Sequence, residues 1–237
     1  MIGPVEVLSP NVGTLELQKY CAEDLDVVNA AKVSFAGYSE SMGAHETGLL
    51  GFLLRNDHMS PFEHNFFKFR VRAPIAVARE WVRHRIGTSW NEESGRYTVL
   101  RPDFYVPSPE NVRSQVGKPG SYSFDQIKDP DLIVRGQEAM EGTYEFCWDT
   151  YNFLKDDLGW AKELARFVLP VGMYTEWIWS CNARSLMHFC TLRNAPDAQL
   201  EIRVYAQAIE DIFAQIMPVT YTWFRDVDIV EANSTKK

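Results

Sequence analysis

The chain has 237 residues, a length that fits one large domain or two small ones. Hydrophobic residues make up 46% and charged residues 24%, values typical of a soluble globular protein. The 32 acidic and 24 basic side chains give a formal net charge of −8, which argues against a general binder of nucleic acids or membrane surfaces, because such binders are usually basic.

Three features of the sequence bear on its compartment. The four cysteines are too few and too scattered for a disulfide scaffold or a paired-cysteine zinc site. No apolar run approaches the roughly 18–20 residues of a membrane-spanning helix. The residues after Met1 have neither the basic region nor the apolar core of a signal peptide. We therefore expect a cytoplasmic, reduced protein with no membrane partner.

Local patterns predict the first elements of the chain. Short alternations indicate a hairpin over residues 5–20, and an apolar face predicts a helix over 23–34. Ser60 is a candidate N-cap, because a proline follows it and Glu63 stands at the capping-box position.

Residues 65–72 alternate cleanly and predict a half-buried strand with Arg72 on its polar face. The next pattern predicts a helix over residues 74–85, and a polar loop follows over residues 87–95. Residues 97–106 are expected to be extended.

The pattern changes after an irregular stretch over residues 107–119. Long helical periodicity covers residues 130–154, and residues 174–179 alternate like a strand. Asn182 is a candidate cap for a helix that ends near Arg193. Asp197 is a candidate cap for a further helix that ends near Met217.

Strands and helices are segregated rather than strictly alternating, so the sequence predicts an α+β fold. No repeat or long linker interrupts the chain, and we expect one domain over residues 1–237. Residues 231–237 are polar and are expected to fray.

One window has a charge opposite to that of the whole chain. Eight bases and three acids lie between Lys68 and Arg101, and seven of the eight bases are arginines. Guanidinium groups suit phosphates and planar carbonyl edges. A solvated strand face explains the first bases of the window equally well. Arg83-His84-Arg85, followed by a polar segment with Gly87 and Gly95, indicates a site for a polyanion instead.

Five ordered blocks of the sequence resemble one family. Arg83-His84-Arg85, followed after eight residues by Ser94-Gly95-Arg96-Tyr97, resembles the signature of flavin-dependent thymidylate synthase. The other four blocks that resemble elements of this family are Ala31–Phe35, His58–His64, Arg166–Pro170 and a C-terminal block made of Asn182–Arg193 and Ala198–Arg203.

This resemblance implies an activity, cofactors and a fold. The family makes dTMP from dUMP, with 5,10-methylenetetrahydrofolate as carbon donor and FAD, reduced by NADPH, as hydride source. The family fold is a mixed α/β subunit with an antiparallel sheet and long helices. It assembles as a homotetramer whose sites are shared between subunits. Partners are then small molecules rather than nucleic acids.

The resemblance also implies a set of site residues. Those expected at the cofactors are His58, Ser60, Glu63, Arg83, His84, Arg85, Glu92, Asn182, Arg184 and His188. His58 in particular is expected against the folate or flavin ring. Those expected at the nucleotide are Glu80, Trp81, Val82, Arg83, Glu92, Glu93, Ser94, Gly95, Arg96, Arg166 and Arg193.

Charge chemistry suggests how these residues divide the work. Arg96 and Arg166 suit the nucleotide phosphate, whereas Arg83, Arg85 and Arg184 suit the flavin end. A guanidinium at Arg193, the residue expected to be catalytic, can stabilise an ionised uracil ring without a protein nucleophile. Taken without the family, Arg193 fits better as a cation near a helix C-terminus.

Ser94 is expected to donate a hydrogen bond to a phosphate or ring rather than attack as a nucleophile. A serine nucleophile needs an oriented base, and no carboxylate is placed in the sequence to orient His84. The spacing of His58 and His64 matches no zinc motif, so we expect no metal.

The family signature usually has seven residues where this chain has eight, Ile86 to Glu93. We expect the extra residue to reshape a loop between two intact ends.

Three other functions stay open at this point. A metal-dependent nucleotide phosphohydrolase would use the histidines, the acids and the arginines. A flavin or nucleotide sensor would bind without turnover. An RNA-binding module would use the arginine-rich window.

Overall fold

The computed structural model describes the backbone of residues 3–118 and 121–234, and side chains over residues 3–118 and 122–226. Within it the chain forms two compact units, each built from separate segments. The first unit contains Met1–Val71, Glu80–Asn91 and Trp177–Lys237, and the second contains Arg72–Arg79 and Glu92–Glu176. The expected single-domain organisation stays a prediction.

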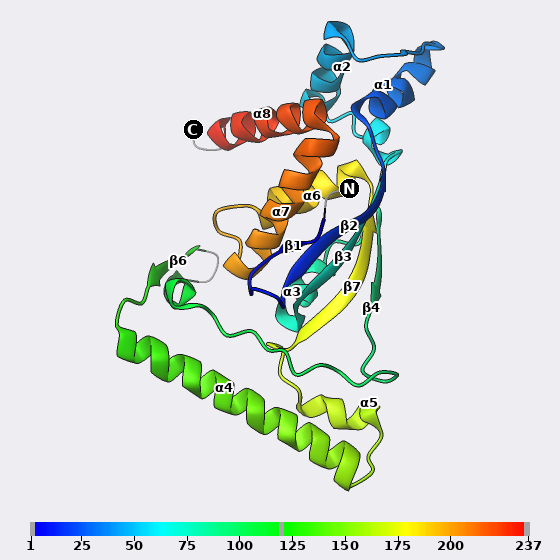
Figure 1. Ribbon diagram of the computed structural model, residues 1–237. Coiled ribbons are helices and arrows are strands. Elements are labelled where there is room, and N and C mark those ends of the chain that lie inside the picture. Colours follow the sequence, from blue (N-terminus) through cyan, green and yellow to red (C-terminus); the bar gives the residue numbers. More distant parts are fainter. Residues whose placement is uncertain (1–2, 119–120, 235–237) are drawn as a thin grey trace. The chain divides into compact units, whose positions relative to one another are not determined.

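Five strands form one sheet in the order β1-β2-β3-β7-β4 (Figure 1). Their bounds are Val5–Glu6, Thr14–Cys21, Phe66–Pro74, Tyr174–Cys181 and Thr88–Glu92 for β1, β2, β3, β7 and β4. β1 and β2 pair antiparallel, with Val5 opposite Leu15, which confirms the predicted N-terminal hairpin. β3 and β7 confirm the two strands predicted from alternation.

The alternation of β3 builds the core of the first unit. Phe67 and Phe69 are fully buried on one face of the strand. The Phe67 ring meets Phe213 of α7 (Leu200–Ile216) at 6.0 Å, and the Phe69 ring stacks on Trp179 of β7 at 5.8 Å. Burying an aromatic side chain of this size contributes about 1.5–3 kcal/mol.

Trp81 lies at the centre of this aromatic core and is fully buried. Its ring contacts Trp177 and Trp179, each at 5.3 Å, and Phe189 of α6 (Ala183–Arg193) at 4.6 Å. The residues just before the Arg-His-Arg motif are thereby fixed against both the sheet and α6.

Helices complete the first unit. Their bounds are Asp24–Lys32 for α1, Ala44–Arg55 for α2, Ala183–Arg193 for α6, Leu200–Ile216 for α7 and Pro218–Ser234 for α8. The Asn182 side chain accepts from Ser185 N at 2.8 Å, which confirms the predicted cap of α6. Asp197 does not cap α7. A turn closed by Ala198 N and Ala195 O holds it outside the helix, whose N-cap is Gln199.

α2 and α8 were not predicted, and tertiary contacts hold both of them. The Asp24 carboxylate accepts from Val219 N at 3.0 Å and from Thr220 N at 2.8 Å at the start of α8. Trp223 of α8 packs over Gly51 of α2, where an added Cβ would lie 2.6 Å from the indole ring. α8 is helical through Ser234, and residues 235–237 of the tail expected to fray lie outside the described residues.

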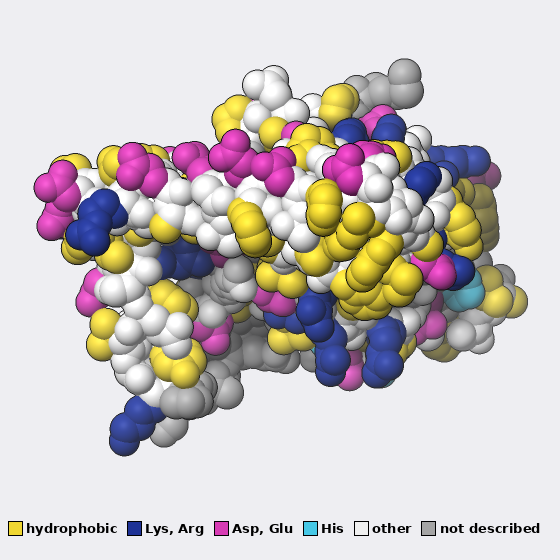
Figure 2. Space-filling view, turned by 90° about the horizontal axis from the view of Figure 1, so that it is seen from below, with side chains coloured by type: hydrophobic (Ala, Val, Ile, Leu, Met, Phe, Trp, Pro, Cys, Tyr) yellow, Lys and Arg dark blue, Asp and Glu magenta, His cyan; other side chains and the backbone are white. Residues whose placement is uncertain are grey.

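The second unit contains the long helix α4 (Pro130–Asn152), the short helix α5 (Lys162–Ala165) and a hairpin of β5 (Arg113–Lys118) and β6 (Ser121–Gln126). α4 confirms the long predicted helix. In the view of Figure 2, acidic and apolar side chains gather over α4 and α5. Residues 107–119, which were expected to be irregular, contain β5, and this strand pairs with β6.

Arg72 was expected on a polar strand face but is buried. Its guanidinium pairs with Asp103 and lies 5.8 Å from the Tyr174 ring. Burial of an arginine requires a charged partner, and here that partner lies far along the chain.

Three local predictions around the motif segments were wrong. Ser60 does not cap a helix: it begins a single 3-10 turn, Ser60–Glu63, with no side-chain cap. α3 (Ile75–Trp81) ends before the Arg-His-Arg motif rather than after it. The segment expected to be a loop contains the strand β4. Among the described residues no helix is long and apolar enough to cross a membrane.

Candidate functional site

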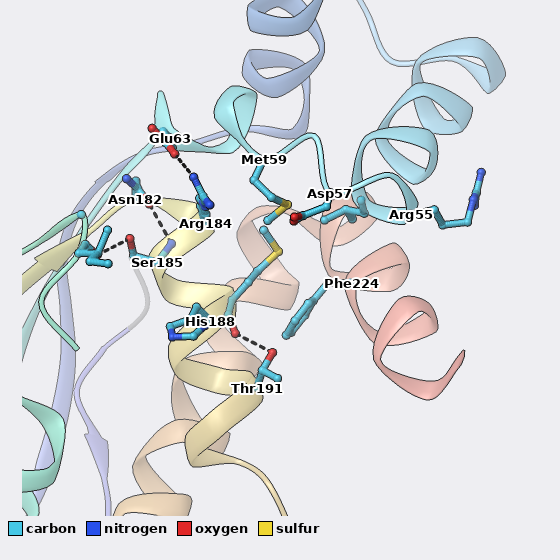
Figure 3. A pocket seen from close by; sticks show the side chains of 14 residues that line it. Arg55, Asp57, Met59, Glu63, Asn182, Arg184, Ser185, His188, Thr191 and Phe224 are labelled. Carbon is cyan, nitrogen blue, oxygen red and sulfur yellow. Dashed lines mark hydrogen bonds and ion pairs between the residues drawn. The ribbon is translucent and has the colours of Figure 1, made fainter. Parts of the chain in front are cut away.

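α6 lines a cavity of about 660 Å³ in the first unit (Figure 3). Arg184 and His188 lie one helical turn apart on this helix, and both line the cavity. Met59 comes from the segment after α2, and Phe224 comes from α8. Cationic, polar and apolar groups converge here, and the volume lies within the roughly 300–1,000 Å³ of small-molecule pockets.

Arg184 forms an ion pair with Glu63, and both residues line this cavity (Figure 3). The two side chains are 51% and 42% exposed. Exposed pairs of this kind are worth only about 0–1 kcal/mol. An anionic ligand can therefore replace Glu63 beside Arg184 at small cost.

The turn at Gly87 is fixed against the start of α6. Gly87 has φ +67°, and an added Cβ would lie 2.3 Å from Ser185 Oγ and 2.9 Å from Asn182 Nδ2. Ser185 Oγ donates to the Ile86 carbonyl at 2.8 Å. The close approach that this glycine permits is therefore an approach to α6, and it ties the Arg-His-Arg segment to the cavity.

Arg193, at the last turn of α6, is bonded to residues on both sides of Trp81. Its Nε donates to His84 Nε2 at 2.9 Å, and its Nη2 donates to the Glu80 carbonyl at 3.2 Å. Nη1 lies 3.4 Å from Glu80 Oε2. The structure thus brings together three residues of the predicted site.

Burial governs the ionisation of this group. Desolvation, followed by the charges of Arg193 and His188, lowers the pKa of His84 to about 4. Desolvation raises the pKa of Glu80, with Arg193 opposing and Glu201 adding to the shift. His84 is therefore neutral at pH 7.

His58 and Ser60 line a different cavity of the first unit, about 830 Å³ in volume. The His58 ring meets Phe52 edge-on at 5.7 Å, and exposed Phe35 and Tyr38 complete an aromatic wall. Such a wall suits a flat ring. Across the described side chains, no group of three or more His, Cys, Asp or Glu is arranged to hold a metal ion.

The second unit, described by itself, contains other residues of the set predicted at the nucleotide. Tyr97 N and Thr98 N both donate to the Ser94 carbonyl, at 3.0 and 3.1 Å, and form a tight turn. A Cβ on Gly95 would lie 3.3 Å from Arg166 Cδ, so the glycine lets Arg166 pack against this turn.

Arg96 extends from the same turn. Its Nε donates to Glu163 at 2.8 Å, and both side chains are about half exposed. The turn therefore carries the Ser94 hydroxyl and Arg96, and Arg166 packs against it, a donor set that fits a phosphate.

The remaining predicted residues are distributed less evenly. Arg83 and Arg85 are exposed, and neither pairs with an acid among the described residues. Glu92 accepts from Thr175 Oγ1 at 2.8 Å. Glu93 lies 4.0 Å from Arg101. The Trp81 side chain belongs to the core, which leaves only its backbone for a ligand, whereas Val82 is 42% exposed.

Several residues that line the α6 cavity were not predicted from the sequence: Leu54, Arg55, Asp57, Met59, Ile86, Ser185, Met187, Thr191 and Phe224. Thr191 could have been found, because it follows Arg184 and His188 at the seven-residue spacing of one helix face. Arg55 is the last residue of α2, and Phe224 lies within α8. Neither helix was predicted from the sequence.

Comparison with known proteins decides the family. Residues 16–219 match the model of the thymidylate synthase complementing protein family. The chain belongs to this family. The flavin-dependent thymidylate synthase of Streptomyces avermitilis is 40% identical, over 93% of this chain and 95% of its own. That of Kosmotoga olearia is 41% identical, over 90% of each chain.

A solved member of known architecture supports the same conclusion. The crystal structure of a UMP/dUMP methylase, PolB from Streptomyces cacaoi, bound with 5-Br UMP matches with a TM-score of 0.84 and 39% identity. The match covers 94% of this chain and 97% of that one. Both the family resemblance and the mixed fold with an antiparallel sheet are confirmed.

Proposed function

We propose that this chain is a flavin-dependent thymidylate synthase, which methylates dUMP to dTMP with 5,10-methylenetetrahydrofolate as carbon donor. The observation that carries the proposal is the family match over residues 16–219, which includes all five motif blocks. FAD, reduced by NADPH, supplies the hydride when bound. The task of the protein is then to position the reactants and to stabilise charge.

The α6 cavity fits the cofactor. Arg184 lies in the first turn of α6, where a helix also favours anions, and exposed Arg83 and Arg85 add positive charge for a diphosphate. Met59 and Phe224 give the apolar surface that a flat ring requires. We assign these residues to FAD, together with His188.

The nucleotide residues divide by chemistry. Arg96, Arg166 and Ser94 suit the phosphate. Arg193 suits the pyrimidine, because a preorganised guanidinium stabilises negative charge that develops on the ring. This assignment needs no protein nucleophile.

The aromatic cavity around His58 suits the folate, and its support is the flat, apolar wall described above.

A cytoplasmic location is part of the same proposal. We also propose a homotetramer with shared sites. Its support is the set of large apolar side chains exposed on α4, α5 and the adjoining segments: Phe146, Phe153, Leu158, Trp160, Leu164 and Phe167.

UMP is a second candidate substrate, because the solved relative is described as a UMP/dUMP methylase. Only the ribose 2′-hydroxyl separates the two nucleotides. A direct comparison of the two therefore belongs in the first assay.

The test incubates the purified protein and FAD with NADPH, methylenetetrahydrofolate and either dUMP or UMP, and identifies the methylated product by chromatography. The expected result is dTMP that depends on all components. Arg193→Ala should lower the rate by about 10²–10³. Ser94→Ala should lose only about 1–2 kcal/mol of transition-state stabilisation. A protein that binds flavin without turnover is a sensor. A colourless protein that hydrolyses nucleotides with a metal contradicts the proposal outright.

A further inference from the structure

The guanidinium of Arg193 is held at all three of its nitrogen atoms. Nε donates to His84 Nε2, Nη2 to the Glu80 carbonyl, and Nη1 approaches Glu80 Oε2. A guanidinium has five N–H groups. Two of them remain after these contacts, one on each Nη atom, and the Arg193 side chain keeps 23% of its surface exposed.

The bond between the two side chains fixes the protonation state of His84. Arginine is always protonated, so Nε must be the donor. His84 Nε2, at 2.9 Å, must then present a lone pair. The imidazole is therefore neutral and carries its hydrogen on Nδ1, because an imidazolium would place two N–H groups against each other.

The surroundings of His84 maintain this state. On α6 the ring faces Arg193, His188 at 5.9 Å and the apolar Phe189 ring at 5.0 Å. On α3 the charged neighbour of the pair is Glu80, and Glu201 of α7 adds negative charge beside it. Partial burial is the main cause that opposes protonation, and the charge of Arg193 is the next, which is why the pKa lies far below its usual value.

The backbone of His84 is fixed as well. Its N donates to the Trp81 carbonyl at 3.0 Å, and its carbonyl accepts from Thr88 Oγ1 at 2.8 Å. Trp81 is part of the buried core. The acceptor is thus presented to Arg193 by a rigid segment rather than by a flexible loop.

We propose that His84 is a positioning residue for Arg193: as a neutral acceptor it holds Nε and leaves the two outer N–H groups directed at the substrate pyrimidine. The inference rests on the proposed function, which puts Arg193 at the ring. It gives His84 a role that a cationic phosphate ligand cannot perform, because an imidazolium cannot accept the Nε hydrogen.

The first test observes the tautomer without any turnover. The FAD-loaded protein is labelled with ¹⁵N-histidine, and the His84 signals are identified by their absence in His84→Gln. At pH 7 we expect the nitrogen shifts of a neutral ring with hydrogen on Nδ1. In Arg193→Ala the Nε2 signal should move, because its donor is lost. An imidazolium, or hydrogen on Nε2, overturns the proposal even if the protein makes dTMP.

The second test compares three variants at saturating dUMP, with flavin content and melting temperature measured first. The side-chain amide oxygen of glutamine reaches the position of His84 Nε2. The amide oxygen of asparagine reaches only the position of Nδ1. We expect His84→Gln to keep kcat within about fivefold, and His84→Asn and His84→Ala to lose at least about 20-fold. Equal activity of the two amide variants overturns the proposal.

The pH dependence of kcat tests the neutral state of His84 independently. Because His84 is already neutral, kcat should show no step attributable to it near pH 6.5, where an ordinary histidine titrates. A step near pH 6.5 that disappears in His84→Gln overturns the proposal. If the wild-type protein forms no methylated nucleotide, the proposed function fails, while the tautomer measurement still decides the role of His84.

Discussion

Replacing Gly87 by alanine tests whether the turn after the Arg-His-Arg motif is held by α6. Gly87 has a left-handed conformation, φ +67°, which costs an alanine about 1–2 kcal/mol. The new Cβ would also lie 2.3 Å from Ser185 Oγ, so the serine must move.

The size of the effect follows from the contacts that are disturbed. Moving Ser185 breaks its bond to the Ile86 carbonyl, worth about 0.5–1.5 kcal/mol. Pressure on Asn182 weakens the cap of α6, worth about 1 kcal/mol. With the backbone strain, Gly87→Ala should lower the free energy of unfolding by about 2–4 kcal/mol.

The assay is urea unfolding at fixed protein concentration, together with retention of FAD after gel filtration. Gly48→Ala is the matched control: Gly48 lies within α2, and nothing lies within 4 Å of its added Cβ. It should be neutral or stabilising by up to about 1 kcal/mol. Adding Ser185→Ala to Gly87→Ala removes the clashing oxygen, so the double variant should lose less than the sum of the single variants.

Equal stability of Gly87→Ala and the wild type would refute the reasoning. So would strict additivity in the double variant, because it would mean that the two side chains do not meet.

Two further predictions concern stability. Asp24→Asn should lower the free energy of unfolding by about 1–3 kcal/mol, because three bonds to Val219 N, Thr220 N and Thr220 Oγ1 converge on this carboxylate; urea unfolding measures it, and an unchanged midpoint would contradict it. Hydrogen bonds from Lys32 and then Ser39 lower the pKa of Glu46 to about 2 from 4.5, so its contribution is full above pH 4.5 and is lost as the pH falls toward 2. Glu46→Gln should therefore reduce the pH dependence of the melting temperature between pH 4.5 and pH 2. An unchanged pH dependence would show that the ionisation of Glu46 does not affect stability.

The fold was predictable wherever the deciding contacts are local. The alternation of residues 65–72 and the cap at Asn182 are set within a few positions, and both were confirmed. The prediction that Arg72 lies on a polar face was wrong, because its partner Asp103 lies 31 positions away. Helix α8 was not predicted, because its start is fixed by Asp24, more than 190 positions earlier.

The candidate site shows the same division. The family resemblance named Arg193, His84 and Glu80 separately as site residues, and each is part of the observed cluster. Their mutual bonds were not predictable, since Arg193 and His84 are 109 positions apart. The packing of the aromatic core brings them together, because Trp81 and Phe189 lie in contact between the two segments.

The extra residue of the signature falls within or beside regular structure, and this changes what its deletion should do. The strand β4, Thr88–Glu92, occupies most of the segment expected to be a loop. Trp90 stacks on Trp177 of β7 with ring centroids 4.5 Å apart. A loop would absorb the loss of one residue, whereas in a strand it turns every later side chain to the opposite face.

Deleting Thr88 should therefore break the Trp90 stack and weaken FAD retention by more than tenfold, about 1.4 kcal/mol. Thr88→Ala is the control, because it removes the hydroxyl bond to the His84 carbonyl but keeps the register of the strand. Flavin titration reports FAD binding, and tryptophan fluorescence compared with that of Trp90→Phe reports the stack, because the chain has seven tryptophans. A deletion variant that folds and binds FAD within tenfold of the wild type would show that the segment tolerates a shift of register and behaves as a loop after all.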